Sequence, residues 1–292
     1  MSLRRQDILA SIGFVLPSIL IILAVAFLPI AATFVLSFSE TKISQLVPRD
    51  FVGLSNYLDY LGNRTFWQPA GRPPFFPFGG GGGEVLRGGG PPLLPPARPP
   101  LWRFLRISLI LPWAVPTIVN GALWRWIYNA DYGALNALLH QAGLIERYIP
   151  WLTRPLPAMN LIIGADIWHS VPFVALILQA ALATIPNELE EAAAVDGANA
   201  LQRFLFVRLP LLRSAILVVL VIRTVEAFRV FDIIYVITQG GPAFASETLN
   251  IYIFQTGFNY FHLGYASSLL IVLFVIVMSV SLILIRVRRA DW

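Results

Sequence analysis

One uncharged stretch near the start of the chain limits what this sequence can fold into. It runs from residue 8 to residue 39, between Asp7 and Glu40. A transmembrane helix needs about 20 mostly apolar residues, so this stretch can cross a bilayer with tilt to spare. The apolar core of a cleaved signal peptide is shorter, about 7 to 15 residues. We therefore expect an uncleaved membrane helix at this position.

Four further apolar stretches have the length and composition of membrane spans. They cover about residues 105–129, 157–185, 214–238 and 263–285. The whole chain is 57% hydrophobic and 13% charged, whereas about a quarter of an ordinary soluble domain is charged. This composition excludes a water-soluble single-core protein. The sequence predicts an all-α, polytopic membrane protein with five clear spans.

Charged residues lie mainly at the ends of these stretches. Arg4 and Arg5 precede the first, while Arg286, Arg288 and Arg289 follow the last. Because positively charged flanks stay on the cytoplasmic side, both termini are predicted to be cytoplasmic. The net charge is +5, but because the basic residues mainly flank the apolar stretches we attribute them to membrane orientation and expect no nucleic acid partner. The absence of cysteine excludes disulfides and thiolate metal sites.

Five spans cannot leave both termini on one side, so one crossing is missing. The place to look is residues 68–100, which hold 10 prolines and 9 glycines. One interpretation is a genuine Pro/Gly-rich loop, which cannot hold a continuous helix. The other is that this anomalous segment stands in place of a second membrane helix, as two compensating frame shifts in the gene would produce. We favour the second interpretation, because a sixth helix gives the even number of crossings that two cytoplasmic termini require.

The segment 186–213, between the third and fourth clear spans, carries the most specific pattern. Asn187 and Glu190 have the spacing of a capping box, which predicts a helix from about Glu188. Three alanines then remove bulky side chains, and Gly197 permits a bend or a close approach. A short helix of this kind can dock in a partner's cleft. It can also be an ordinary surface connector, since alanine is the best helix former.

The spacing within this segment resembles a known signature. It resembles the EAA motif of permease subunits in binding-protein-dependent ATP-binding-cassette importers. The matching residues are Glu191-Ala192-Ala193, then Asp196-Gly197, and then Leu209-Pro210. The family prefers isoleucine where Val207 stands. The likeness covers residues 8–66 and 101–292, and residues 231–249 resemble the sugar-permease branch. Residues 68–100 depart from the family pattern, where the family has its second helix.

The resemblance implies a transmembrane permease domain over 1–292 with six membrane helices and a cytoplasmic coupling loop at 186–213. It implies a bacterial or archaeal cytoplasmic membrane, and as partners two ATPase subunits, a second homologous permease and an extracytoplasmic sugar-binding protein. The chain lacks a phosphate-binding G-x-x-x-x-G-K-[ST] loop, so we expect no cofactor on it, with ATP and Mg on the ATPase subunits. The implied ATPase-coupling residues are Glu190, Glu191, Ala192, Ala193, Asp196, Gly197, Leu209 and Pro210.

Polar residues inside the predicted spans are candidates for the substrate path, because their burial in a membrane is costly. Aromatic faces and hydrogen-bonding groups suit sugars. The candidates are Asn120, Asp166, Trp168, Glu226, Tyr235 and Gln239. A structural interpretation competes: Arg223 with Glu226, and Arg229 with Asp232, are three residues apart and can neutralise each other. Asn120 can equally make an ordinary interhelical hydrogen bond.

Two other classes of protein compete with the importer. An ion-coupled secondary transporter also needs charges within the membrane, and Asp166 or Glu226 could serve it. A membrane enzyme lacks support, since neither H-E-x-x-H nor G-x-S-x-G occurs. We therefore predict a non-enzymatic transport subunit for a sugar or oligosaccharide, and the sequence leaves the sugar open.

Overall fold

The computed structural model describes residues 3–42, 50–61, 66 and 110–290. These residues form helices, turns and isolated bridges, and no strand occurs among them. The all-helical prediction is therefore confirmed. The Pro/Gly-rich segment 68–100 lies outside the described residues, so the second helix and the count of six stay predictions.

Four of the described helices are long and apolar enough to cross a membrane. They cover Ile12–Leu36, Pro155–Leu182, Ala200–Arg229 and Leu263–Arg286. The first, third and last predicted spans are thereby confirmed to within a few residues. The buried share of each ranges from 0% to 33%, as expected for helices whose outer faces meet lipid.

One compact unit comprises Met1–Phe66 and Tyr252–Ile276. Its described helices and helical turns are α1 (Leu3–Ile22), a π-helical turn (Leu23–Phe27), α2 (Leu28–Leu36), α3 (Ser55–Leu61), a second π-helical turn (Gln255–Asn259) and the first part of α15 (Leu263–Ala290). The Asn56 side-chain amide donates to the carbonyl oxygens of Ser37 and Ser39, at 2.9 and 3.0 Å. This buried side chain therefore holds α3 against the residues that follow α2.

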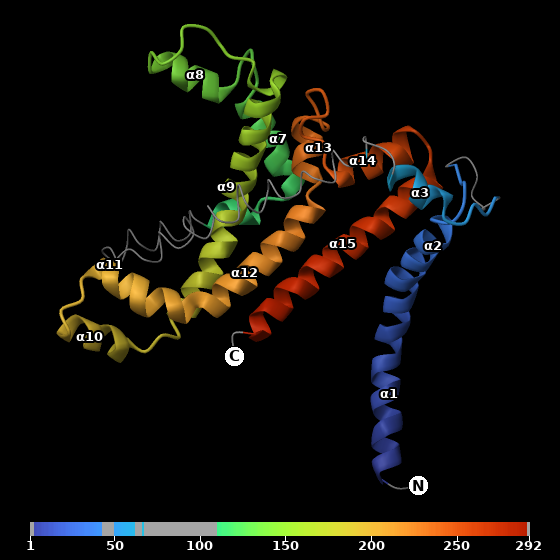
Figure 1. The fold of residues 1–292 in the computed structure, drawn as a ribbon, viewed down its shortest axis with the longest axis horizontal. Coiled ribbons are helices and arrows are strands. Elements are labelled where there is room, and N and C mark those ends of the chain that lie inside the picture. The colour runs from blue at the N-terminus through green and yellow to red at the C-terminus, as the bar shows by residue number, and fades with distance from the viewer. Residues whose placement is uncertain (1–2, 43–49, 62–65, 67–109, 291–292) are drawn as a thin grey trace. The chain divides into compact units, whose positions relative to one another are not determined.

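The other unit comprises Trp67–Ile251 and Val277–Trp292. Its described helices are α7 (Thr117–Ile127), α8 (Ala134–Gln141), α9 (Pro155–Leu182), α10 (Asn187–Val195), α11 (Ala200–Arg203), α12 (Leu209–Arg229) and α13 (Asp232–Ile237), with the first half of α14 (Leu249–Phe254) and the end of α15. In Figure 1, α9 and α12 lie side by side, and α10 and α11 lie at one end of them. Buried Val174, Leu178 and Val219 form an apolar cluster between α9 and α12.

Two predicted spans have different boundaries in the structure. Within 105–129, the described part is not one helix, because the chain is extended at Pro116 and α7 begins at Thr117. Within the predicted fourth span, 214–238, residues 214–229 instead belong to a helix that starts at Ala200 and ends at Arg229. The chain is extended at Val230, where the Asn250 side chain donates to the carbonyl oxygens of Phe228 and Val230. This capping of free carbonyls ends α12 and lets α13 start separately.

Candidate functional site

A polar pocket of about 230 Å³ lies among α7, α9, α12 and α13, all within one compact unit. Asn120 comes from α7, Asp166 from α9 and Glu226 from α12, so three of the six predicted substrate-path residues meet here. The other lining residues are Trp113, Thr117, His169, Ser170, Phe173, Arg223, Ala227, Arg229, Val230, Phe231, Asp232 and Ile233. Most of these are polar or aromatic, as in a site for a hydroxylated ligand.

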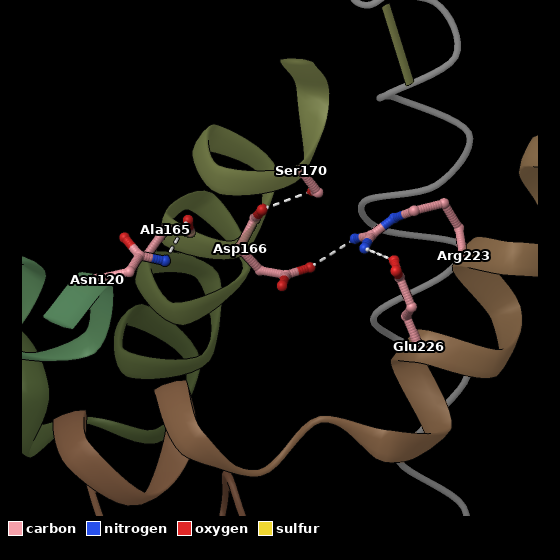
Figure 2. Close-up of polar contacts among 6 residues, drawn as sticks. All are labelled: Asn120, Ala165, Asp166, Ser170, Arg223 and Glu226. Carbon is pink, nitrogen blue, oxygen red and sulfur yellow. Dashed lines mark hydrogen bonds and ion pairs between the residues drawn. The ribbon is translucent and has the colours of Figure 1, made fainter. Parts of the chain in front are cut away.

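Arg223 is the centre of the charged network in the pocket (Figure 2). Its guanidinium donates to Asp166 Oδ2 on α9 at 2.8 Å and to Glu226 Oε2 on its own helix at 2.6 Å. The side chain of Arg223 is only 9% exposed, whereas that of Glu226 is 47% exposed. The predicted pairing of Arg223 with Glu226 is confirmed. Its bond to Asp166 also links α12 to α9.

The second predicted pair is wrong. Arg229 ends α12 and Asp232 begins α13, so the two residues do not share a helix. Within the described part of the chain, no ion pair joins them. Asp232 instead accepts a hydrogen bond from the hydroxyl of Thr117 on α7, at 2.5 Å. The break at Val230 has removed the helical spacing on which the prediction depended.

Asn120 is 1% exposed and has an unequal set of contacts. Its amide nitrogen reaches the carbonyl oxygen of Ala165 at 3.5 Å, a long contact, and its Oδ1 has no partner in the described structure (Figure 2). The predicted interhelical hydrogen bond is thus present but leaves an acceptor unused in the pocket. Leaving a buried polar atom without a partner is unfavourable, so Oδ1 has an unfilled capacity to accept a hydrogen bond.

Other pocket residues add a fixed acceptor and an aromatic surface. His169 Nδ1 lies 2.9 Å from the carbonyl oxygen of Pro112 and must carry a proton to bond with it. In the neutral ring, Nε2 is then an acceptor. Trp113 and Phe173 stack with centroids 5.7 Å apart. Sequence reasoning missed both aromatic residues, because two aromatics far apart in the chain give no pattern.

The remaining three predicted path residues do not line this pocket. Trp168 packs edge-on against Trp124, with ring centroids 5.6 Å apart. Tyr235 stacks on Phe231. Gln239 follows α13 with a φ of 54°, and its N–H bonds the last turn of that helix. In this structure these three residues lie outside the pocket lining.

The predicted coupling segment contains the exposed helix α10 (Asn187–Val195), which begins within a residue of the predicted start. The expected capping box is absent, because Pro186 occupies the cap position and makes no side-chain bond. A capping box is present further along, where Asn199 and Gln202 exchange side-chain and backbone hydrogen bonds at α11. The sequence holds the spacing for both, and the structure uses the second.

Gly197 follows α10 with a φ of +83°. The N–H of Ala198 donates to the Ala193 carbonyl and the N–H of Gly197 to the Ala194 carbonyl, which is the Schellman arrangement of a helix end. A Cβ added at Gly197 would meet nothing within 4 Å. The bend is therefore the reason for glycine within this chain.

Glu190 pairs with Arg208, which is 18 residues away in the helix leading into α12. Arg208 Nε and Nη2 donate to the two Glu190 carboxylate oxygens, each at 2.5 Å. This hydrogen bonding, helped by the charge of Arg208 and of Arg203, lowers the pKa of Glu190 below its ordinary value of 4.5. Sequence reasoning missed Arg208, because nothing in the spacing shows that α10 folds back toward it.

The other predicted coupling residues lie around this pair. Glu191, Ala192, Asp196 and Gly197 are exposed, and Ala193 is half-buried. Exposed Leu209 and Pro210 begin α12, directly after the π-helical turn Phe204–Arg208. Helix α10 has no buried residue, and Val195 at its end is 88% exposed. The helix thus presents acids and small or apolar side chains on an open surface.

Apolar helices of membrane-spanning length, two of which line a polar pocket, together with an exposed helix are typical of a membrane transport subunit. Residues 97–289 match the family of inner membrane components of binding-protein-dependent transport systems, and the chain belongs to that family. The family predicted from the EAA pattern is confirmed. The chain is therefore a multi-pass membrane protein and a subunit of a transport system.

Two named relatives cover almost the whole chain. The trehalose/maltose transport system permease protein MalF of Thermococcus litoralis is 36% identical over 285 residues, covering 96% of this chain and 94% of the relative. The sulfoquinovosyl glycerol transport system permease protein SmoG of Agrobacterium fabrum is 32% identical over 291 residues, covering 97% of this chain and 91% of the relative. Neither is named as an ion-coupled carrier, so that alternative gains no support.

A solved structure shares the fold. A chain of a bacterial ATP-binding-cassette transporter that imports the acidic polysaccharide alginate matches with a TM-score of 0.82 at 20% identity, covering 98% of this chain and 96% of that one. A second structure, of the bacterial alginate transporter with an alginate pentasaccharide-bound periplasmic protein, matches with a TM-score of 0.78 at 21% identity. At this identity the likeness concerns the fold.

Proposed function

We propose that this chain is the permease subunit of an ATP-binding-cassette importer that moves a sugar or oligosaccharide across the cytoplasmic membrane. The observation that carries the proposal is the 36% identity to a trehalose/maltose permease over 96% of this chain. The other named relative transports a sugar derivative as well, a sulfoquinovosyl glycerol. Both termini lie on the cytoplasmic side, as the flanking arginines require.

The pocket among α7, α9, α12 and α13 forms this subunit's part of the substrate path. Asn120 Oδ1 accepts from a sugar hydroxyl, and the Trp113–Phe173 pair packs against apolar C–H faces. Asp166 and Glu226 supply further acceptors, and Arg223 holds both carboxylates in place. A second homologous permease closes the path from the other side.

An ATPase subunit binds α10, and the importer contains two such subunits. The support is the exposed surface of α10, together with the match of Glu191, Ala192, Ala193, Asp196 and Gly197 to the family's coupling signature. ATP and Mg are bound by the ATPases. Nucleotide favours one of two conformations of the permease, and substrate biases the same equilibrium from the pocket.

An extracytoplasmic binding protein delivers the sugar. The family description names binding-protein-dependent transport, and a solved alginate transporter with this fold was determined with its periplasmic binding protein. Such a partner selects the sugar before it reaches the pocket. The permease then needs to accept hydroxyl-rich ligands with moderate selectivity.

Co-purification and uptake test the proposal together. We expect the tagged chain, extracted from its native membrane in mild detergent, to retain an ATPase and a second permease. Right-side-out membrane vesicles containing the complex, supplied with its binding protein outside, should take up radiolabelled trehalose or another sugar from a panel only when ATP is present inside. Uptake driven by a sodium or proton gradient without ATP, with no ATPase retained, would contradict the proposal.

A further inference from the structure

The ion pair between Glu190 and Arg208 is the feature that the proposed function leaves unused. It is a two-bond contact, with each guanidinium nitrogen donating to its own carboxylate oxygen at 2.5 Å. The side chains are 24% and 29% exposed, so both are partly shielded from water. Two parallel bonds fix orientation as well as distance, which a single contact does not. The pair therefore holds α10 at a defined angle to the helix that carries Arg208.

The backbone between α10 and α12 offers two places to bend. The left-handed Gly197 separates α10 from α11, and the π-helical turn Phe204–Arg208 precedes Pro210. Leu209 N–H donates to the Phe204 carbonyl, five residues back, and Pro210 has no N–H to donate. π-helical turns and prolines are common sites of helix bending. Without a side-chain link, motion of α10 would be absorbed at these two places.

The position of Arg208 makes it an effective link. It is the last residue of the π-helical turn, immediately before α12. Arg223 lies on α12, about 22 Å further along the helix axis, and joins Asp166 on α9. The helical stretch Ala200–Arg229 thus has an ion pair to α10 near its start and an ion pair to α9 beside the pocket.

We propose that the Glu190–Arg208 pair is a positioning pair that carries the movement of α10 past the bend at Gly197 to the last residue of the π-helical turn, which leads directly into α12. This inference rests on the proposed function, in which an ATPase moves α10. Glu190 acts through Arg208, and neither residue touches the substrate. An exposed neighbour on the first turn of α10, Glu188, makes no ion pair within the described residues and serves as the matched control.

The first experiment needs only the full chain in lipid nanodiscs. The natural sequence has no cysteine, so V195C and L211C place spin labels on exposed sites of α10 and α12 alone. In the parent, we expect a narrow distribution of distances between the two spin labels. The distribution should be at least twofold broader in E190Q and in R208Q, and narrow again in the charge swap E190R/R208E. E188Q should match the parent. Unchanged widths in E190Q and R208Q, or a swap as broad as either single variant, would overturn the pair as a link.

The second experiment uses the complex with its ATPases. Labels at L156C on α9 and L211C on α12 report movement with and without a non-hydrolysable ATP analogue and Mg²⁺. We expect the nucleotide-induced shift, compared at equal amounts of bound ATPase, to fall below a third of its parental size in E190Q and to recover fully in the swap. A full-size shift in E190Q overturns the transmission role while leaving the importer assignment intact. A parent complex with no ATPase or no shift overturns the proposed function, and the transmission role with it.

Discussion

Asp166 and Arg223 are 57 residues apart in the chain, and their side chains meet at 2.8 Å between α9 and α12. Arg223 also binds Glu226, so one cation neutralises part of the charge of two acids at the wall of a pocket. Removing the cation therefore differs from removing either acid. This asymmetry gives a direct test of the network.

Arg223→Gln should destabilise the chain more than Asp166→Asn. The first change leaves both acids without the cation that they share, at a cost of about 3 kcal/mol, whereas the second leaves Arg223 paired with Glu226 and costs about 1 kcal/mol. SDS titration of the purified chain in mixed micelles measures both. Equal losses of stability in the two variants, or a larger loss for Asp166→Asn, would show that Arg223 is not the cation on which both acids depend.

Gly197→Asn should retain at least half of the ATPase binding of the parent, and Gly197→Val less than a tenth. Asparagine adopts the left-handed conformation far more easily than a β-branched residue, for which it costs roughly 2 kcal/mol or more. Quantitative co-purification of the ATPase is the measurement. If asparagine is as damaging as valine, the partner needs the empty space at Gly197 and the bend is secondary.

Gly121→Ala should weaken the contact between α7 and α13. An added Cβ at Gly121 would lie 3.0 Å from the Val236 Cβ and 3.4 Å from the Ile233 Cα, so one helix must shift by a few tenths of an ångström. Gly164 on α9 is the control, since a Cβ there meets nothing within 4 Å. Gly164→Ala should be neutral or stabilising by up to about 1 kcal/mol through helix propensity. The same SDS titration compares them, and a larger loss for Gly164→Ala would contradict the packing described here.

The link between α10 and α12 should survive mild acid and loosen only in strong acid. The pKa of Glu190 in the folded chain is lower than its ordinary value of 4.5, so the stabilisation is complete above that value and is lost as the pH falls through the folded pKa. The width of the distance distribution between labels at V195C and L211C, followed from pH 7 downward, should rise below pH 4.5. E190Q should show no such step, and a step above pH 5 in the parent would contradict the assignment.

Local spacing predicted contacts within one helix and failed across a break. Arg223 and Glu226 share α12, and their pairing followed from a separation of three residues. Arg229 and Asp232 have the same separation, yet α12 ends between them. The signal for that break is Asn250, 20 residues beyond Val230, and no local pattern reports a contact at such a distance.

Residue types were predicted better than their partners. Asp166 was predicted as a site residue because burying a charge inside a membrane span is costly. Its pairing with Arg223 could not be predicted, because it depends on how α9 packs against α12. Glu190 was expected to cap its own helix and instead binds Arg208. A bidentate pair with an arginine is stronger than a bond to one backbone N–H, so the long-range partner prevails. The coupling segment could be recognised from the sequence because its motif is local. The pocket could not, because its lining comes from helices that are far apart in the chain.

The amide of Asn250 that caps α12 also has a consequence for synthesis of the chain. Its two acceptors, the carbonyl oxygens of Phe228 and Val230, leave the ribosome 22 and 20 residues before it does. Until Asn250 follows them, those oxygens lack the partner that ends the helix. The two hydrogen bonds that cap the end of α12 can thus form only after all of α12 and α13 has been translated.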